Sequence, residues 1–138
     1  MTVTPVPKPG VQERILLHLR DYVDHAEKVE VPFALSQMGI ANAVSIARSN
    51  VPRAISGLRD QGYLVEKQAH VTGVSRKRKA YFLTDEGAKL ADDIWSKVGK
   101  QNVRVIGKDG RASNMELAEA LENTDLPLRH VDVIRYLD

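Results

Sequence analysis

The chain has 138 residues, of which 43% are hydrophobic, and this length suits one domain with a small appendage. It contains no cysteine, which excludes disulfides, thiolate metal sites and cysteine nucleophiles. Because no thiol accompanies its four histidines, we do not expect a structural zinc site. No stretch approaches the roughly 18 apolar residues of a membrane span, and the first ten residues lack the pattern of a signal peptide. We therefore expect a cytoplasmic protein in which residues 1–10 form a disordered lead-in.

The net charge of +2 is unevenly distributed along the chain. Residues 1–70 carry 8 basic and 7 acidic side chains, and residues 86–138 carry 8 and 10, whereas residues 71–85 carry 4 and 1. The excess is therefore one run of four cations, Arg76, Lys77, Arg78 and Lys79. A concentrated patch attracts a polyanion more strongly than the same charge spread evenly.

The first part of the chain is predicted to be mainly helical. Apolar residues recur at helical spacing through residues 11–26, which indicates an amphipathic helix. Residues 28–32, KVEVP, indicate a short edge strand, because Pro32 cannot donate to a ladder.

A short helix is predicted to begin after Ser36 and to end near Val44. Ser36 is the expected N-cap, and Leu35 and Ile40 have the spacing of a hydrophobic staple. A tight turn over residues 44–46 then leads into another helix.

The apolar stripe of this next helix is Val51, Ala54, Ile55 and Leu58, and Gly62 is its expected C-cap. If Ser49 is the N-cap, Pro52 lies in the first turn, where a missing N–H removes no intrahelical bond. A start at Ala47 would instead cost one bond. We favour the later start.

Two helices joined by a tight turn form a helix-turn-helix unit, in which the first braces the second against the major groove of DNA. Because the apolar stripe must face the core, the opposite side is left for bases. The polar or small residues expected there are Arg48, Ser49, Asn50, Arg53, Ser56 and Gly57. Asparagine pairs with adenine and arginine with guanine through two hydrogen bonds each, and Gly57 leaves room for a close approach of backbone or phosphate.

A β-hairpin is predicted next, because YLVEKQAHV and RKRKAYFL are strand-like runs separated by a four-residue turn. Its tip carries a group that we call the basic wing: Ser75, Arg76, Lys77, Arg78 and Lys79. Adjacent cations repel one another unless an anion is present, and extended basic loops can follow phosphates or enter the minor groove.

Thr84 is the predicted cap of a further helix, whose buried stripe is Leu90, Ala91, Ile94, Trp95 and Val98. Residues 101–138 are expected to form an extension of strand, helix and helix. In it Asn102–Ile106 is the strand, Ser113 to Glu116 has the spacing of a capping box before Leu117, and Pro127 begins the last helix. The extension is predicted to be a dimer or partner surface, or a link to a further domain.

The stretches GIANAVSIARSNVPRAISGLRDQGYLVEK and HVTGVSRKRKAYFLTDEG resemble the prokaryotic winged-helix transcription regulators of the MarR-like and ArsR-like group. The resemblance implies a mainly α fold with a small β-hairpin, a winged helix-turn-helix domain over residues 11–100. It implies that Arg48, Ser49, Asn50 and Arg53 contact DNA, that residues 76–79 form the wing, and that the protein is a homodimer on two-fold related half-sites. The chain departs from the family at Ala47, where a capping serine or threonine is common, and in residues 101–138.

Other functions have weaker support in the sequence. His18 and His25 are seven residues apart near Asp21, but surface histidines are usually solvated and no third ligand follows. GKDGR at residues 107–111 lacks the spacing of a phosphate loop and fits a hairpin or a strand-to-helix turn. We therefore expect a DNA-binding protein that is not an enzyme, with no cofactor, metal or recognisable effector site. The alternative is a winged helix that serves as a protein-interaction or adaptor module.

Overall fold

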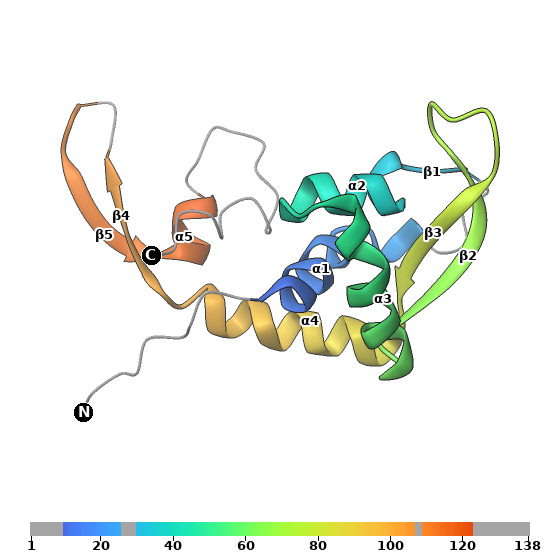
Figure 1. Ribbon diagram of the computed structural model, residues 1–138. Helices are drawn as coiled ribbons and strands as arrows, with labels where there is room; N and C mark the ends of the chain where they lie inside the picture. Colours follow the sequence, from blue (N-terminus) through green and yellow to red (C-terminus); the bar gives the residue numbers. More distant parts are fainter. Residues whose placement is uncertain (1–9, 26–29, 107–108, 123–138) are drawn as a thin grey trace.

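The computed structural model describes residues 10–25, 30–106 and 109–122. The helices are α1 (Val11–Arg20), α2 (Gln37–Val44), α3 (Val51–Asp60), α4 (Asp85–Val98) and α5 (Leu117–Glu122), with 3-10 turns at Val23–His25, Phe33–Leu35 and Arg48–Asn50. The strands are β1 (Glu30–Val31), β2 (Leu64–Val71), β3 (Arg78–Leu83), β4 (Asn102–Ile106) and β5 (Ala112–Glu116). Helix α1 lies centrally between α2 and α4, and two hairpins rise at opposite ends of the molecule (Figure 1).

The predicted short helix with its cap is confirmed in α2. The Ser36 hydroxyl accepts a hydrogen bond from the Gly39 N–H at 3.1 Å, and Leu35 and Ile40 are both buried. Helix α2 ends at Val44, and its C-cap Ser45 is left-handed with φ 59°. From α1, Arg14 Nη1 donates to the Val44 carbonyl at 2.8 Å and so holds the end of α2 in place.

Helix α3 confirms the predicted apolar stripe, since its buried residues are Val51, Ala54, Ile55 and Leu58. The expected N-cap was one residue too early: a 3-10 turn occupies Arg48–Asn50 and Asn50 is the N-cap. Pro52 still lies in the first turn, so its missing N–H removes no helical bond. Gly62 follows with φ 82°, and the N–H groups of Gly62 and Tyr63 bond back to Arg59 and Leu58, which is a Schellman ending.

The centre of the core is α1, in which five successive residues from Ile15 to Leu19 are buried. Ordinary amphipathic helices bury one stripe, but α1 packs against α2, α3, α4 and β3. The prediction of a longer helix was wrong, because α1 ends at Arg20, and Val23 is 46% exposed. The solvated interpretation of His18 was also wrong: it is fully buried, with Nε2 2.7 Å from the Ala34 carbonyl oxygen. Ala26, the last predicted residue of that helix, lies outside the described residues.

The predicted hairpin is β2 paired antiparallel with β3, and the short strand β1 joins β2 in parallel, Val31 opposite Val71. Thr84 caps α4 as predicted, since its Oγ1 accepts from the Gly87 N–H at 3.1 Å. The same hydroxyl donates to the Gly62 carbonyl at 2.6 Å, which ties the end of α3 to the start of α4. The order from α1 to α4 is therefore that of a winged helix-turn-helix, with β2 and β3 as the wing.

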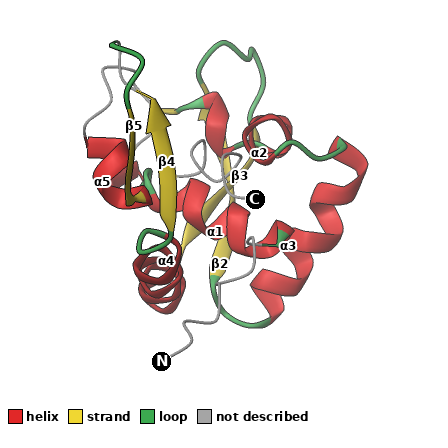
Figure 2. Cartoon of the chain, turned by 90° about the vertical axis from the view of Figure 1, so that its left-hand side faces the viewer, coloured by secondary structure: helices red, strands yellow, loops and turns green. Residues whose placement is uncertain are grey.

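The capping box predicted over residues 113–116 was wrong, because these residues form β5, which pairs with β4 from Asn102 opposite Glu116 to Ile106 opposite Ala112. A serine three residues before a glutamate is compatible with either structure, and the nearby strand β4 decides the outcome. We call β4 and β5 the second hairpin. Helix α5 follows at once and packs against both strands (Figure 2). The predicted helix from Pro127 lies outside the described residues.

Candidate nucleic-acid interface

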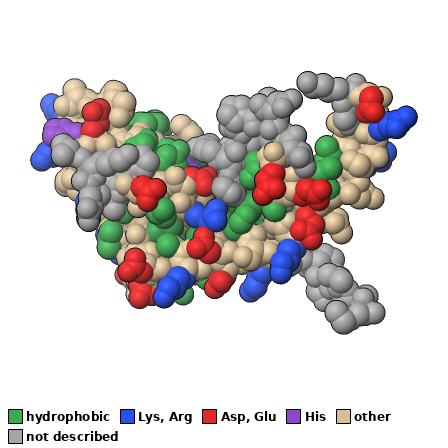
Figure 3. Space-filling view, turned by 180° about the vertical axis from the view of Figure 1, so that it is seen from behind, with side chains coloured by type: hydrophobic (Ala, Val, Ile, Leu, Met, Phe, Trp, Pro, Cys, Tyr) green, Lys and Arg blue, Asp and Glu red, His purple; other side chains and the backbone are tan. Residues whose placement is uncertain are grey.

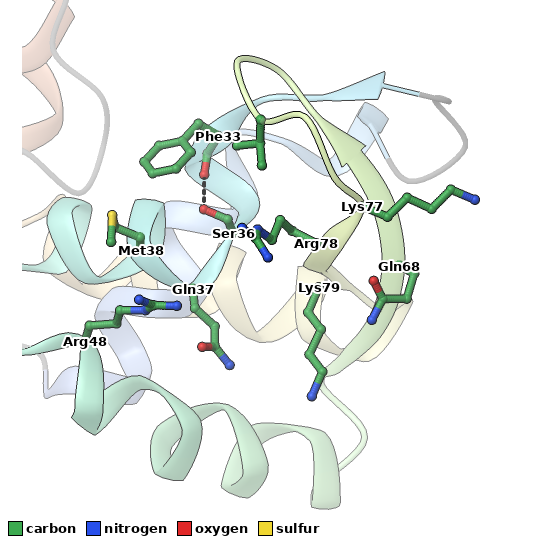
Figure 4. A pocket seen from close by; sticks show the side chains of 10 residues that line it. Phe33, Ser36, Gln37, Met38, Arg48, Gln68, Lys77, Arg78 and Lys79 are labelled. Atoms are coloured by element: carbon green, nitrogen blue, oxygen red, sulfur yellow. Dashed lines mark hydrogen bonds between the residues drawn. The ribbon is translucent and has the colours of Figure 1, made fainter.

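A groove of about 550 Å³ runs between α2, the turn that precedes α3, and the wing (Figure 4). Its lining residues are Phe33, Ser36, Gln37, Met38, Arg48, Gln68, Val74, Lys77, Arg78 and Lys79. Four of these ten are cations and none is acidic, so we call it the basic groove. Arg48 reaches it from the helix side, and Lys77, Arg78 and Lys79 reach it from the wing.

The front of α3 is open to solvent. Arg48, Ser49, Asn50 and Arg53 are all exposed, and Ser56 is half-buried. Arg48, Ser49 and Asn50 form the 3-10 turn that directly precedes α3. Of the predicted α3-side residues, the basic groove includes Arg48 alone, and the others lie on the adjoining surface.

Gly57 has a packing partner within the protein. A Cβ atom built at Gly57 would approach Nε2 of Gln12 to 2.5 Å, and the same Nε2 donates to the Ala54 carbonyl at 3.5 Å. The missing side chain at Gly57 therefore makes room for Gln12 of α1, which differs from the expectation that it makes room for a phosphate.

The basic wing is fully exposed. Ser75, Arg76 and Lys77 lie in the loop, while Arg78 and Lys79 begin β3, where they pair with Ala69 and Gln68 of β2. Strand β3 is fixed to the helix-turn-helix by an isolated bridge between Ala80 and Ser36, the N-cap of α2. The position of the wing cations relative to α2 is thus set by backbone pairing.

Sequence reasoning missed the α2 wall of the basic groove. Phe33 is 39% exposed and Met38 is 43% exposed, and both line the groove with Gln37. No local pattern distinguishes these residues, because their function as a groove wall depends on a wing more than thirty residues away. The one signal in the sequence was that apolar residues, Phe33 and Met38, stand close to the predicted N-cap Ser36.

The surface over α4 has a different character. Its exposed charged side chains are Asp85, Glu86, Lys89, Asp92, Asp93 and Lys97. Figure 3 shows acidic and basic side chains interspersed on this side of the molecule. Four of the six are acidic, so the α4 surface is net negative, in contrast to the basic groove.

Among the described residues, no three His, Cys, Asp or Glu side chains are grouped closely enough to hold a metal ion. Within the same residues, no helix combines the length and apolar character needed to cross a membrane.

No protein-family model and no curated protein matches the chain. Among solved structures, it is similar to a zinc-responsive MarR family member, Lactococcus lactis ZitR, with 21% identity, a TM-score of 0.49, and coverage of 68% of this chain and 56% of that one. It is also similar to MepR, a transcription regulator of the Staphylococcus aureus multidrug efflux pump MepA, with 22% identity, a TM-score of 0.46, and coverage of 63% and 55%. The chain thus spans little more than half the length of these proteins. The fold assignment rests on the topology of the chain itself.

Proposed function

We propose that this chain binds double-stranded DNA in a sequence-specific manner and acts as a transcription regulator in the cytoplasm. The observation that carries the proposal is the basic groove, which is lined by four cations from two separate elements and by no acidic residue. Neighbouring cations repel one another unless an anion is present, and a phosphate backbone supplies regularly spaced negative charge.

The residues divide by the kind of contact they offer. Ser49, Asn50 and Arg53, exposed at the front of α3, read base edges in the major groove. Arg48 and the basic wing hold phosphates or enter the minor groove. Ser56 lies further along α3 and is a peripheral contact, and Gly57 contributes through packing on Gln12.

We infer that two copies of the chain bind two-fold related half-sites. A single α3 contacts only a few base pairs, whereas two copies one helical turn apart double the recognised sequence. Residues 101–138 are our candidate for the surface that joins the copies. Deleting residues 101–138 and measuring the mass in solution tests this. A dimer that persists without these residues would mean that the joining surface lies elsewhere.

Selection of bound duplexes from a random pool tests DNA binding and half-site spacing together. Arg53→Ala is expected to relax preference at one base position and to cost about 1–3 kcal/mol. The control is Lys89→Ala, an exposed cation of α4 outside the basic groove, which should leave the selected sequence unchanged. A wild-type protein that neither binds heparin nor shifts random duplex DNA at low salt would contradict the proposal and favour the adaptor alternative.

A further inference from the structure

Gln37, the first residue of α2, connects the basic groove with the core. Its side chain lines the groove together with Arg48 and Lys79 (Figure 4). Its Nε2 donates a hydrogen bond to the Oη of Tyr81, on β3, at 3.0 Å. A residue that faces the groove is thus fixed from behind by a buried phenol.

Tyr81 is 1% exposed and lies opposite Glu66 in the pairing of β3 with β2. Burial raises the pKa of Tyr81, the hydrogen bond from Gln37 opposes this rise, and the nearby negative charge of Glu66 adds to it. The phenol therefore keeps its proton at neutral pH. Glu66 pairs with Nη1 of Arg59, on α3, at 3.5 Å. The Gln37 bond thus joins α2 to β3, and the Arg59 pair joins α3 to β2.

The bond to Tyr81 determines which atom Gln37 offers to the groove. An amide nitrogen only donates hydrogen bonds, so the phenol oxygen is the acceptor. Gln37 thus directs its NH₂ group inward. The carbonyl Oε1 is therefore the atom available to a ligand in the groove. This assignment follows from the donor and acceptor order, the information that fixes an amide orientation.

We propose that Gln37 is a specificity-determining residue carried by α2, which offers Oε1 to the exocyclic amine of adenine or cytosine, and that Tyr81 is the positioning residue that fixes it. In the major groove adenine and cytosine present an amine donor, whereas guanine and thymine present only acceptors at the corresponding edge. A free glutamine amide satisfies either pattern by rotating, whereas one whose nitrogen is held by Tyr81 turns Oε1 toward the groove and so favours the first. The inference rests on the proposed function and adds a second reading element beside α3.

The test compares duplexes selected from a random pool by the wild-type protein, Gln37→Ala and Tyr81→Phe. The wild type should prefer adenine or cytosine at one position that Arg53→Ala does not affect. Gln37→Ala should lose this preference by about three- to tenfold, the range of a single hydrogen bond. Tyr81→Phe should admit guanine and thymine there, because the amide is released, while the salt dependence and the binding of random DNA stay unchanged. A purely structural role of Tyr81 would instead weaken binding to all sequences alike.

The matched controls are Gln61→Ala, an exposed glutamine at the end of α3, and Tyr63→Phe, a half-buried tyrosine at the base of the wing. Both should keep the wild-type preference. If Gln37→Ala selects the same bases as the wild type, the inference is wrong even if Tyr81→Phe fails to fold. If the wild type selects no duplex at all, the proposed function itself is wrong.

Discussion

The two hairpins of this protein differ in how they are connected to the rest of the chain. The wing, β2 and β3, is bordered by β1 on one side and by the Ser36 to Ala80 bridge on the other. The second hairpin, β4 and β5, forms a separate two-stranded sheet. It carries mixed charges, including Arg111 and Asp109 3.7 Å apart at its turn.

A two-stranded hairpin is marginally stable alone, so its position depends on what it packs against. Three connections reach the wing from the helix-turn-helix: the Ser36 bridge, the Gln37 to Tyr81 bond and the Arg59 to Glu66 pair. The second hairpin is followed directly by Leu117, which is 2% exposed and anchors α5 in the core. A fixed backbone holds charge at a defined place, and this applies to Arg78 and Lys79, which are paired with β2.

The largest expected difference between the hairpins is in stability. Leu64→Ala in β2 and Leu117→Ala in α5 each remove a buried leucine, which costs about 2–5 kcal/mol. Leu64→Ala should lower the global free energy of unfolding measured by denaturant titration. Leu117→Ala should mainly release the second hairpin, seen as lost amide exchange protection in β4 and β5 while α1 stays protected. Ile106→Ala, at a 68% exposed position, is the control. If Leu117→Ala lowered the global free energy of unfolding as much as Leu64→Ala, the two hairpins would unfold as one unit.

A smaller difference is expected in DNA affinity. Replacing Arg76 and Arg78 by glutamine removes two charges from the basic wing, and replacing Arg104 and Arg111 removes two from the second hairpin. The wing variant should flatten the slope of log affinity against log salt by up to about 1.8, because each phosphate contact contributes about 0.9. The second-hairpin variant should keep the wild-type slope. Identical slopes in all three proteins would contradict a phosphate-binding role of the wing.

The smallest difference is expected in alkaline stability, since the second hairpin contains no tyrosine. Burial, reinforced by Glu66, raises the pKa of Tyr81 in the folded state above its ordinary value near 10. The unfolded chain then loses the proton first, so the folded state is destabilised as the pH rises past about 10, the ordinary pKa of tyrosine. Denaturant titrations at pH 9 and 10.5 should show this loss in the wild type and in Tyr63→Phe, and a smaller loss in Tyr81→Phe. A loss of the same size in Tyr81→Phe would place the titrating group elsewhere.

Much of the helix-turn-helix could be predicted, because the signals lie within a few residues of each other. The Ser36 and Thr84 caps bond to N–H groups three residues on, and the stripe of α3 follows the helical period. The same kind of local reasoning failed at residues 113–116, where the serine and glutamate spacing suited a helix start and β4 offered a strand partner instead. A local pattern cannot reveal which competing partner is in reach.

The candidate site divides in the same way. The exposed cations of the wing and the polar front of α3 were visible in the sequence, because unpaired charge and an opposing apolar stripe are properties of adjacent residues. The sequence by itself thus determined the caps, the stripes and the place of the positive charge. Only the tertiary structure decided that Phe33, Gln37 and Met38 form the other wall of the groove, and that Gln37 meets Tyr81 across 44 residues of chain. The physical reason is that hydrogen-bond direction and groove shape depend on contacts between distant segments, which only the packed core brings together.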